Sequence, residues 1–256
     1  MKPHSIYCLI LFGLMPVVSM AAAFQEDFQA YPPGVLPEET GGSPWLARPE
    51  GKTNDDGGVV ITRIESDRGN LFAQGADNHY LRLSRSSGNG DTQNVAVNGL
   101  AHSPTIILTL DFLLPSADAP GGMGYVLRVG NAAGNANTAF AICLNDGALW
   151  PTSGTGVNPT KTPLASISLG TVHHLTLVMN NSKEPVVYGP QRSQLSAGQM
   201  DVWLDGECAG SGLAKSGGAD GSGIKTGVRL DSFSITAKVH THGSLWVDNI
   251  SCDSLL

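Results

Sequence analysis

The stretch TIILTLDFLL, residues 105 to 114, decides the fold class of this chain. Apolar and polar residues alternate through most of it. One face carries Ile106, Leu108, Leu110 and Phe112, and the other carries Thr105, Thr109 and Asp111. Because successive side chains of a strand point to opposite faces, this period of two predicts a β-strand with one buried face and one face toward water.

The same alternation recurs along the chain. It predicts further strands at residues 59–65, 80–85, 125–129, 138–144, 174–179, 200–205, 228–236 and 244–252. Turn-forming residues separate these runs, including the hairpin signals Asn145-Asp146-Gly147 and Asp205-Gly206. No run has a helical period, so we expect an all-β protein, an antiparallel β-sandwich formed as a single domain by residues 24–256.

Residues 1–23 have the pattern of a secretory signal peptide, with Lys2, an apolar run and then Ala21, Ala22 and Ala23. We therefore expect an exported protein, secreted or periplasmic. Loss of Lys2 would take the formal net charge from -7 to -8. This mild acidity argues against a nucleic-acid partner, which usually requires a basic patch. No later apolar run reaches the roughly 20 residues of a membrane-spanning helix, so no membrane span is expected.

Three cysteines follow the signal segment: Cys143, Cys208 and Cys252. In an oxidising compartment this odd number allows at most one disulfide within the chain and leaves one thiol over. The spacing does not choose the pair.

Two parts of the sequence resemble concanavalin A-like and laminin-G-like jelly-roll domains. The first is HHLTLVMNN from His173, followed at 200–212 by MDVWLDGECAGSG, which is similar to the strand and apolar-Trp-apolar-Asp-Gly hairpin of those domains. The second is the pair FQEDFQAYPPGVLP (24–37) and LWVDNIS (245–251), which resembles the paired terminal strands of secreted bacterial jelly rolls that bind or cleave polysaccharides. The resemblance implies a sandwich of the jelly-roll, concanavalin A-like kind.

The sequence departs from the enzymes of that group. The Glu-x-Asp-x-x-Glu strand of laminarinase-like glucanases corresponds here to LTLDFLL, which has a single carboxylate. The Arg-rich, Gln-x-His and Tyr-Lys strands of the alginate-lyase members are missing, as are the motifs of serine hydrolases, zincins and nucleotide-binding proteins. The sequence therefore leaves open whether the protein is an enzyme.

Glu26, Asp27 and Asp248 form an acidic set at the two ends of the domain. In the resembling jelly rolls the terminal strands lie side by side, and acidic residues from both can hold Ca²⁺, which prefers oxygen ligands. The resemblance thus implies a structural calcium site. In the alternative, Asp248 only accepts hydrogen bonds from the backbone at the edge of the sandwich, while Glu26 and Asp27 face water.

Aromatic residues suggest a sugar site, because sugar rings stack their C–H surfaces on aromatic faces. Trp203 lies on the strand face opposite Val202 and Leu204 and shares that face with Asp201. We expect Trp203 and Tyr188 to form a stacking platform, aided by hydrogen bonds from Arg128 and Asp201. In the alternative, these aromatic side chains belong to the core.

A catalytic alternative uses His173, His174, Tyr188 and Arg128. A His and a Tyr can abstract the C5 proton of a uronic acid while an Arg stabilises the resulting charge.

The sequence thus favours an exported, monomeric jelly-roll protein that binds polysaccharide or another glycan on its concave sheet. Two alternatives remain open: a polysaccharide lyase or glycoside hydrolase of the same fold, and a structural or adhesive surface module with no sugar site.

Overall fold

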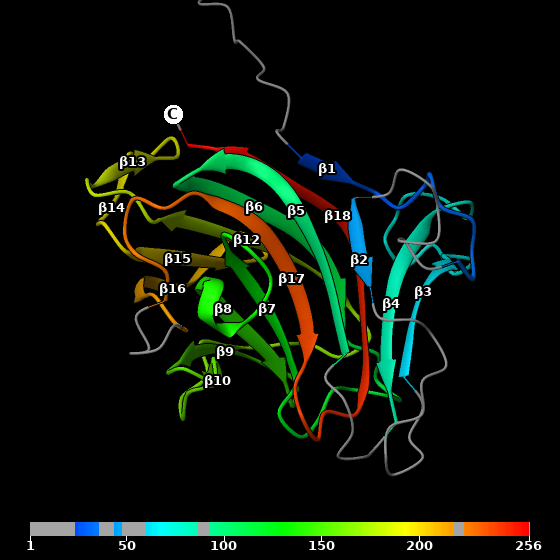
Figure 1. Ribbon diagram of the computed structural model, residues 1–256. Coiled ribbons are helices and arrows are strands. Elements are labelled where there is room, and N and C mark those ends of the chain that lie inside the picture. Colours follow the sequence, from blue (N-terminus) through cyan, green and yellow to red (C-terminus); the bar gives the residue numbers. More distant parts are fainter. Residues whose placement is uncertain (1–23, 36–43, 48–59, 87–92, 218–222, 256) are drawn as a thin grey trace, which may run out of the picture.

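The computed structural model describes residues 24–35, 44–47, 60–86, 93–217 and 223–255. This part of the chain forms two eight-stranded sheets and a separate two-stranded hairpin, with a single short 3-10 turn at Asn135–Asn137 (Figure 1). The strands in every pair run antiparallel, which confirms the all-β sandwich. The predicted signal segment lies outside the described residues. Within them, no helix has the length and apolar character needed to cross a membrane.

The first sheet, called the β12 sheet below, has the strand order β16-β15-β12-β6-β18-β4-β3, with β1 also paired to β18. Its strands are β1 (Phe24–Glu26), β3 (Val60–Ser66), β4 (His79–Arg85), β6 (Thr105–Leu113), β12 (Val172–Asn180), β15 (Gln199–Leu204), β16 (Glu207–Ala214) and β18 (Gly243–Ser254).

The second sheet, the β7 sheet, has the order β10-β9-β8-β7-β17-β5-β2, with β11 paired to β9. Its strands are β2 (Trp45–Ala47), β5 (Gln93–Ser103), β7 (Tyr125–Gly130), β8 (Thr138–Asn145), β9 (Ala148–Ser153), β10 (Asn158–Pro159), β11 (Ala165–Ser166) and β17 (Leu230–Ala237). The remaining hairpin consists of β13 (Val186–Tyr188) and β14 (Ser193–Leu195).

Alternation places one face of each sheet in a shared core. In β6, Leu108, Leu110 and Phe112 are completely buried, whereas Thr109 and Asp111 lie on the opposite face and are partly exposed. The core cluster draws on both sheets, so burial of these inner faces is what holds the sandwich together. The face of each sheet that points away from this core is called its outer face below.

The two terminal strands lie side by side as the sequence indicated. Phe24, Gln25 and Glu26 of β1 pair with Cys252, Ser251 and Ile250 of β18. The prediction that Asp248 lies at an edge of the sandwich is wrong, however. β18 is an interior strand with β6 on one side and β4 followed by β1 on the other, and Asp248 lies directly opposite Asp111 of β6.

Two segments cover opposite ends of the outer face of the β12 sheet. The β13–β14 hairpin packs on one end of this face through Tyr188 and Leu195, which form a buried cluster with Val178 of β12. At the other end, Phe72 packs with Tyr80, Leu113 and Trp246. Between the two apolar clusters the middle of the sheet carries polar side chains.

The three cysteines of the described domain are all free thiols. Cys143 and Cys252 are buried and Cys208 is exposed. No disulfide therefore forms among them, and the one disulfide that the cysteine count allows is not used.

Candidate functional site

A groove of about 330 Å³ opens on the outer face of the β12 sheet, between the sheet and the β13–β14 hairpin. We call it the Trp203 groove. The side chains that shape it are Ile107, Thr176, Tyr188, Pro190, Gln191 and Trp203. None of its lining residues is charged, so the groove combines apolar and aromatic surface with uncharged hydrogen-bonding groups.

Tyr188 and Asp201 attach the hairpin to the sheet. The Tyr188 hydroxyl donates a 2.6 Å hydrogen bond to Asp201 Oδ2. The other oxygen of Asp201 accepts from the Ser211 hydroxyl at 3.0 Å and the Gly212 amide at 2.6 Å, so this buried carboxylate has all its partners within the protein. Burial and the hydrogen bond to Asp201 raise the pKa of Tyr188 to about 12. The hydroxyl therefore stays protonated at neutral pH.

Trp203 lies on the outer face of β15, as the alternation predicted, and is partly exposed. Its indole N–H donates to the Tyr188 hydroxyl at 3.3 Å. Asp201, Tyr188 and Trp203 thus form a connected set, and three of the four residues proposed for sugar binding lie together.

Arg128, the fourth, is in another place. It is on β7, where Tyr125, Leu127 and Val129 point into the core, so its side chain lies on the outer face of the β7 sheet. The sandwich separates it from the Trp203 groove. Arg128 therefore cannot assist Trp203 in holding one sugar unit.

Polar side chains continue from the groove across three neighbouring strands. Thr176 pairs with Thr109, whose hydroxyl lies 2.9 Å from that of Ser251. Next to this row, His174 Nδ1 lies 2.7 Å from Asp111 Oδ1, and the Asn249 side-chain amide donates to Asp111 Oδ2 at 2.8 Å. We call these six residues, Thr176, Thr109, Ser251, His174, Asp111 and Asn249, the polar rows. All six are at least partly exposed.

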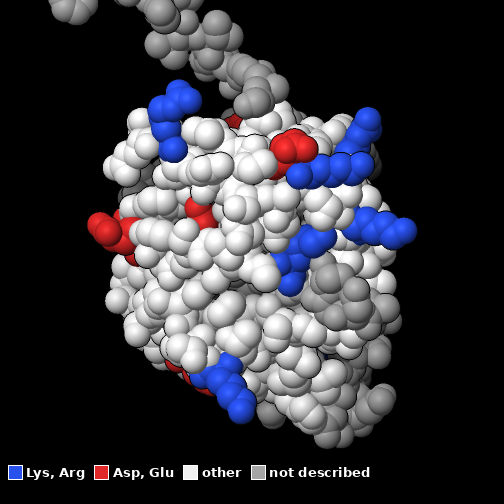
Figure 2. Space-filling view, turned by 90° about the vertical axis from the view of Figure 1, so that its left-hand side faces the viewer, with Lys and Arg blue, Asp and Glu red and all other residues white. Residues whose placement is uncertain are grey.

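Charge is sparse around the groove. Figure 2 shows the side of the molecule formed by β13 to β16, where a few basic and acidic side chains are scattered among broad uncharged areas. This surface lacks the dense positive field that a highly charged partner would require.

The catalytic set is not assembled at one place. His173 is buried on the core side of β12, where Nδ1 lies 2.6 Å from Asp205 and Nε2 lies 3.0 Å from the Ser168 carbonyl oxygen. Both ring nitrogens are thus occupied. His174 is on the outer face, and Arg128 is on the other sheet. The structure therefore brings neither His173 nor Arg128 to the groove that holds Tyr188.

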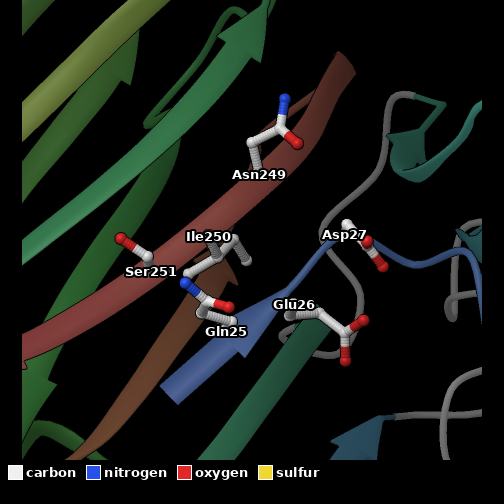
Figure 3. Close-up of a pocket in the computed structure, with 6 residues that line it drawn as sticks. All are labelled: Gln25, Glu26, Asp27, Asn249, Ile250 and Ser251. Atoms are coloured by element: carbon white, nitrogen blue, oxygen red, sulfur yellow. The ribbon is translucent and has the colours of Figure 1, made fainter. Parts of the chain in front are cut away.

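Of the acidic set, Glu26 and Asp27 line a second hollow, of about 470 Å³, where β1 meets β18, and Asp248 is not among its lining residues (Figure 3). Glu26 accepts hydrogen bonds from the Phe28 amide, the Tyr31 hydroxyl and the Trp45 indole, and in Figure 3 its side chain points away from that of Asn249. Asp27 accepts from the Gln29 amide. Among the described residues, no three His, Cys, Asp or Glu side chains converge as metal ligands. Calcium binding stays a prediction, which a comparison of stability with and without a chelator would test.

Asp248 is fully buried and held by two donors. The Asn78 side chain donates to Oδ2 and the Asn249 backbone amide donates to Oδ1, each at 2.8 Å. Burial raises the pKa of Asp248 to about 7, and these donors only partly oppose the effect of burial. The alternative of backbone hydrogen bonding therefore describes part of what Asp248 does, together with the Asn78 contact.

Apart from His174, which the sequence offered as a catalytic candidate, the polar rows and the hairpin wall of the groove were not predicted. The alternation in TIILTLDFLL already placed Thr109 and Asp111 on one face, so one part of the rows had a visible signal. Gly189, Pro190 and Gln191 had none, because their position depends on how the hairpin docks.

Comparisons with known proteins reveal a similarity of fold only. No protein-family model matches the chain, and a search of curated proteins gives no match. Among solved structures, a sialidase is similar with a TM-score of 0.54 and 11% identity over 91% of this chain, which spans 18% of that protein. The globular domain of T. cruzi calreticulin follows with a TM-score of 0.49, 13% identity and 92% of this chain against 89% of that one. At these identities the likeness describes a shared β-sandwich and nothing finer.

Proposed function

We propose that this protein binds a polysaccharide in the Trp203 groove, as an exported recognition protein. The observation that carries the proposal is the connected set of Trp203, Tyr188 and Asp201 at the floor and wall of an uncharged, open groove. Sugars present apolar C–H faces, which stack on aromatic rings, and hydroxyls, which need hydrogen-bond partners. Trp203 supplies the first and the neighbouring polar side chains supply the second.

The size and charge of the groove favour an uncharged sugar unit. A volume of about 330 Å³ is near the lower end of the range for small-molecule sites, which is about 300 to 1,000 Å³. With no charged side chain in the lining, a carboxylate or sulfate placed there would lose water without gaining a counter-charge.

The polar rows provide a path for the rest of a chain. They cross β12, β6 and β18, and adjacent strands lie about 4.8 Å apart, so the path extends about 10 Å beyond the Trp203 groove. Thr176, Thr109, Ser251 and His174 offer hydroxyl and imidazole groups along it. An extended polysaccharide lying on this face would therefore meet hydrogen-bonding partners beyond the stacked ring.

The proposal concerns binding. The protonated Tyr188 hydroxyl, held by Asp201, suits hydrogen bonding better than proton abstraction. The likeness to a protein named a sialidase agrees with a role in sugar recognition, but it covers a small part of that protein and concerns the fold.

The test is a glycan array with the exported form of the protein, followed by titration calorimetry on the best neutral ligand. Trp203→Ala should lower the affinity about 5- to 150-fold, because aromatic stacking contributes about 1 to 3 kcal/mol per ring. Trp203→Phe should retain part of the affinity. Trp150→Phe, on the other sheet, is the matched control and should bind like the wild type. If Trp203→Ala binds every array ligand as well as the wild type does, the groove is not the sugar site.

A further inference from the structure

A set of buried polar groups lies on the outer face of the β7 sheet, away from the Trp203 groove, and two of them have no hydrogen-bond partner. Arg128 is at its centre and is only 7% exposed. Its Nε is buried with no hydrogen-bond partner, and no ion pair among the described residues includes it. Burial lowers the pKa of Arg128 to about 10, and no carboxylate among the described residues opposes this effect.

Lys238 adds a second cation to this face. It is 8% exposed, and its ammonium group donates to the carbonyl oxygen of Gly156, with no ion pair to a carboxylate in the part of the chain that the structure describes. Burial, followed by repulsion from Arg128, lowers the pKa of Lys238 to about 8, so Lys238 is mostly charged at neutral pH. Two buried positive charges therefore lie close enough to repel each other.

Two serines of β17 lie on one side of the arginine. Ser234 is the cross-strand partner of Arg128, and Ser232 is the cross-strand partner of Gly130 on the same face. The Ser232 hydroxyl is buried with no hydrogen-bond partner. On the other side Arg128 pairs with Ala141 of β8. Arg128 is thus flanked by small side chains, with a second unpaired donor on the adjacent strand.

This arrangement is costly for a protein without a ligand. A buried cation that lacks a counter-charge loses its hydration and gains nothing in return, and an unpaired buried hydroxyl adds to the cost. An apolar side chain of similar length at position 128 would avoid the penalty. Two cations and two hydroxyl donors gathered without a carboxylate among the described residues fit a bound group that supplies oxygen acceptors and negative charge.

We propose that the Arg128 cluster, formed by Arg128, Lys238, Ser232 and Ser234, is a second binding site that takes a compact oxyanion, such as the carboxylate or sulfate group of an acidic glycan. The planar guanidinium accepts two oxygens side by side, the ammonium adds a point charge, and the serine hydroxyls donate to the remaining oxygens. Because little of Arg128 is exposed, a small group carried at the end of a substituent fits better than a flat ring.

Thermal melting at constant ionic strength tests the site. Replacing chloride by sulfate or by acetate should raise the melting temperature of the wild type, by about 3 to 5 °C once the anion exceeds its Kd tenfold. Sulfated dextran and oligogalacturonate, compared with neutral dextran, then show whether sulfate or carboxylate is the preferred source. A wild-type melting temperature that responds to none of these anions more than to chloride overturns the proposal.

Variants separate binding from a structural role. Arg128→Met keeps the length of the side chain, so it should melt at the same or a higher temperature in chloride and lose the anion-induced rise. Arg128→Lys keeps the charge but not the paired donors, and should bind the anion at least tenfold more weakly; this variant also serves if Arg128→Met does not fold. Arg229→Gln, at an exposed position, is the control and should keep the full rise. Retention of the rise in Arg128→Met, or unchanged affinity in Arg128→Lys, contradicts the site.

The two sites can be tested independently. Trp203→Ala should keep the anion-induced rise, and Arg128→Met should keep the affinity for a neutral glycan. The failure of one proposal would therefore leave the other unaffected.

Discussion

The Tyr188 hydroxyl donates a 2.6 Å hydrogen bond to the buried carboxylate of Asp201 and thereby joins the β13–β14 hairpin to the outer face of the β12 sheet. The contact connects residues of two separate sheets. It also shapes the Trp203 groove, because Tyr188 is a wall of the groove and accepts the Trp203 indole N–H. Local stability and sugar binding should therefore change together when this bond is removed.

Tyr188→Phe tests this link. The change leaves Asp201 Oδ2 and the Trp203 indole without their partner, so the free energy of unfolding should fall by about 1 to 3 kcal/mol. Affinity for the neutral glycan should also fall, because the hairpin wall is less firmly held. Urea unfolding and calorimetry measure the two effects. Tyr80→Phe is the control, since the Tyr80 ring stacks on Trp246 and its hydroxyl makes no hydrogen bond to the described residues. Equal stability of Tyr188→Phe and wild type would show that the bond contributes nothing.

Asp248 should make stability depend on pH. Its folded pKa, about 7, lies above the ordinary value of 3.8, so the folded protein holds a proton that the unfolded chain releases between about pH 4 and pH 7. Stability must therefore fall as pH rises through that window and level off above it, by an amount on the order of 2 to 4 kcal/mol. Urea unfolding at pH 4.5 to 8 measures the slope.

Asp248→Asn stays neutral at every pH and should remove most of this slope, leaving the variant more stable than the wild type above pH 7. Asp253→Asn, on the same strand and partly exposed, should leave the slope unchanged. A wild-type slope that persists in Asp248→Asn would assign it to other groups.

The thiols should differ sharply in reactivity. Burial raises the pKa of both Cys143 and Cys252 to about 12, whereas Cys208 is exposed. Because the thiolate is the reactive form, a thiol reagent should modify Cys208 rapidly in the folded protein and the other two only after unfolding. Cys208→Ser should abolish the rapid phase. Rapid modification of a second thiol in that variant would contradict the burial of Cys143 and Cys252.

Glu26 should stabilise the protein as a hydrogen-bond acceptor. Glu26→Gln weakens the bonds from the Trp45 indole at 2.8 Å and the Tyr31 hydroxyl at 3.1 Å, and should lower the free energy of unfolding by about 1 to 3 kcal/mol. The loss should be the same with calcium and with chelator, because Glu26 is already occupied by protein donors. A loss that appears only in calcium would instead make Glu26 a metal ligand, as the resemblance implied.

Strand positions could be read from the sequence because alternation is a local property. Each predicted run became a strand, and the paired ends of the domain were confirmed by the register of β1 on β18. β5 was missed, although it lies inside the β7 sheet. Its alternation is interrupted near Gly99, where φ is 82°, and near His102, where φ is 48°. Such irregularities let a strand bend within a sheet, but they hide the period of two.

The sequence by itself determined the all-β class and the outward direction of Trp203 and Asp201, because neighbours along a strand settle which face a side chain occupies. Only the tertiary structure decided which faces meet. It brought Tyr188 to Asp201, placed Asp248 in an interior strand opposite Asp111, and put Arg128 on the other sheet from Trp203. These outcomes depend on pairing between distant segments, such as the contact of Asn249 with Asp111, and on the packing of two sheets around one core. No local pattern records either of them.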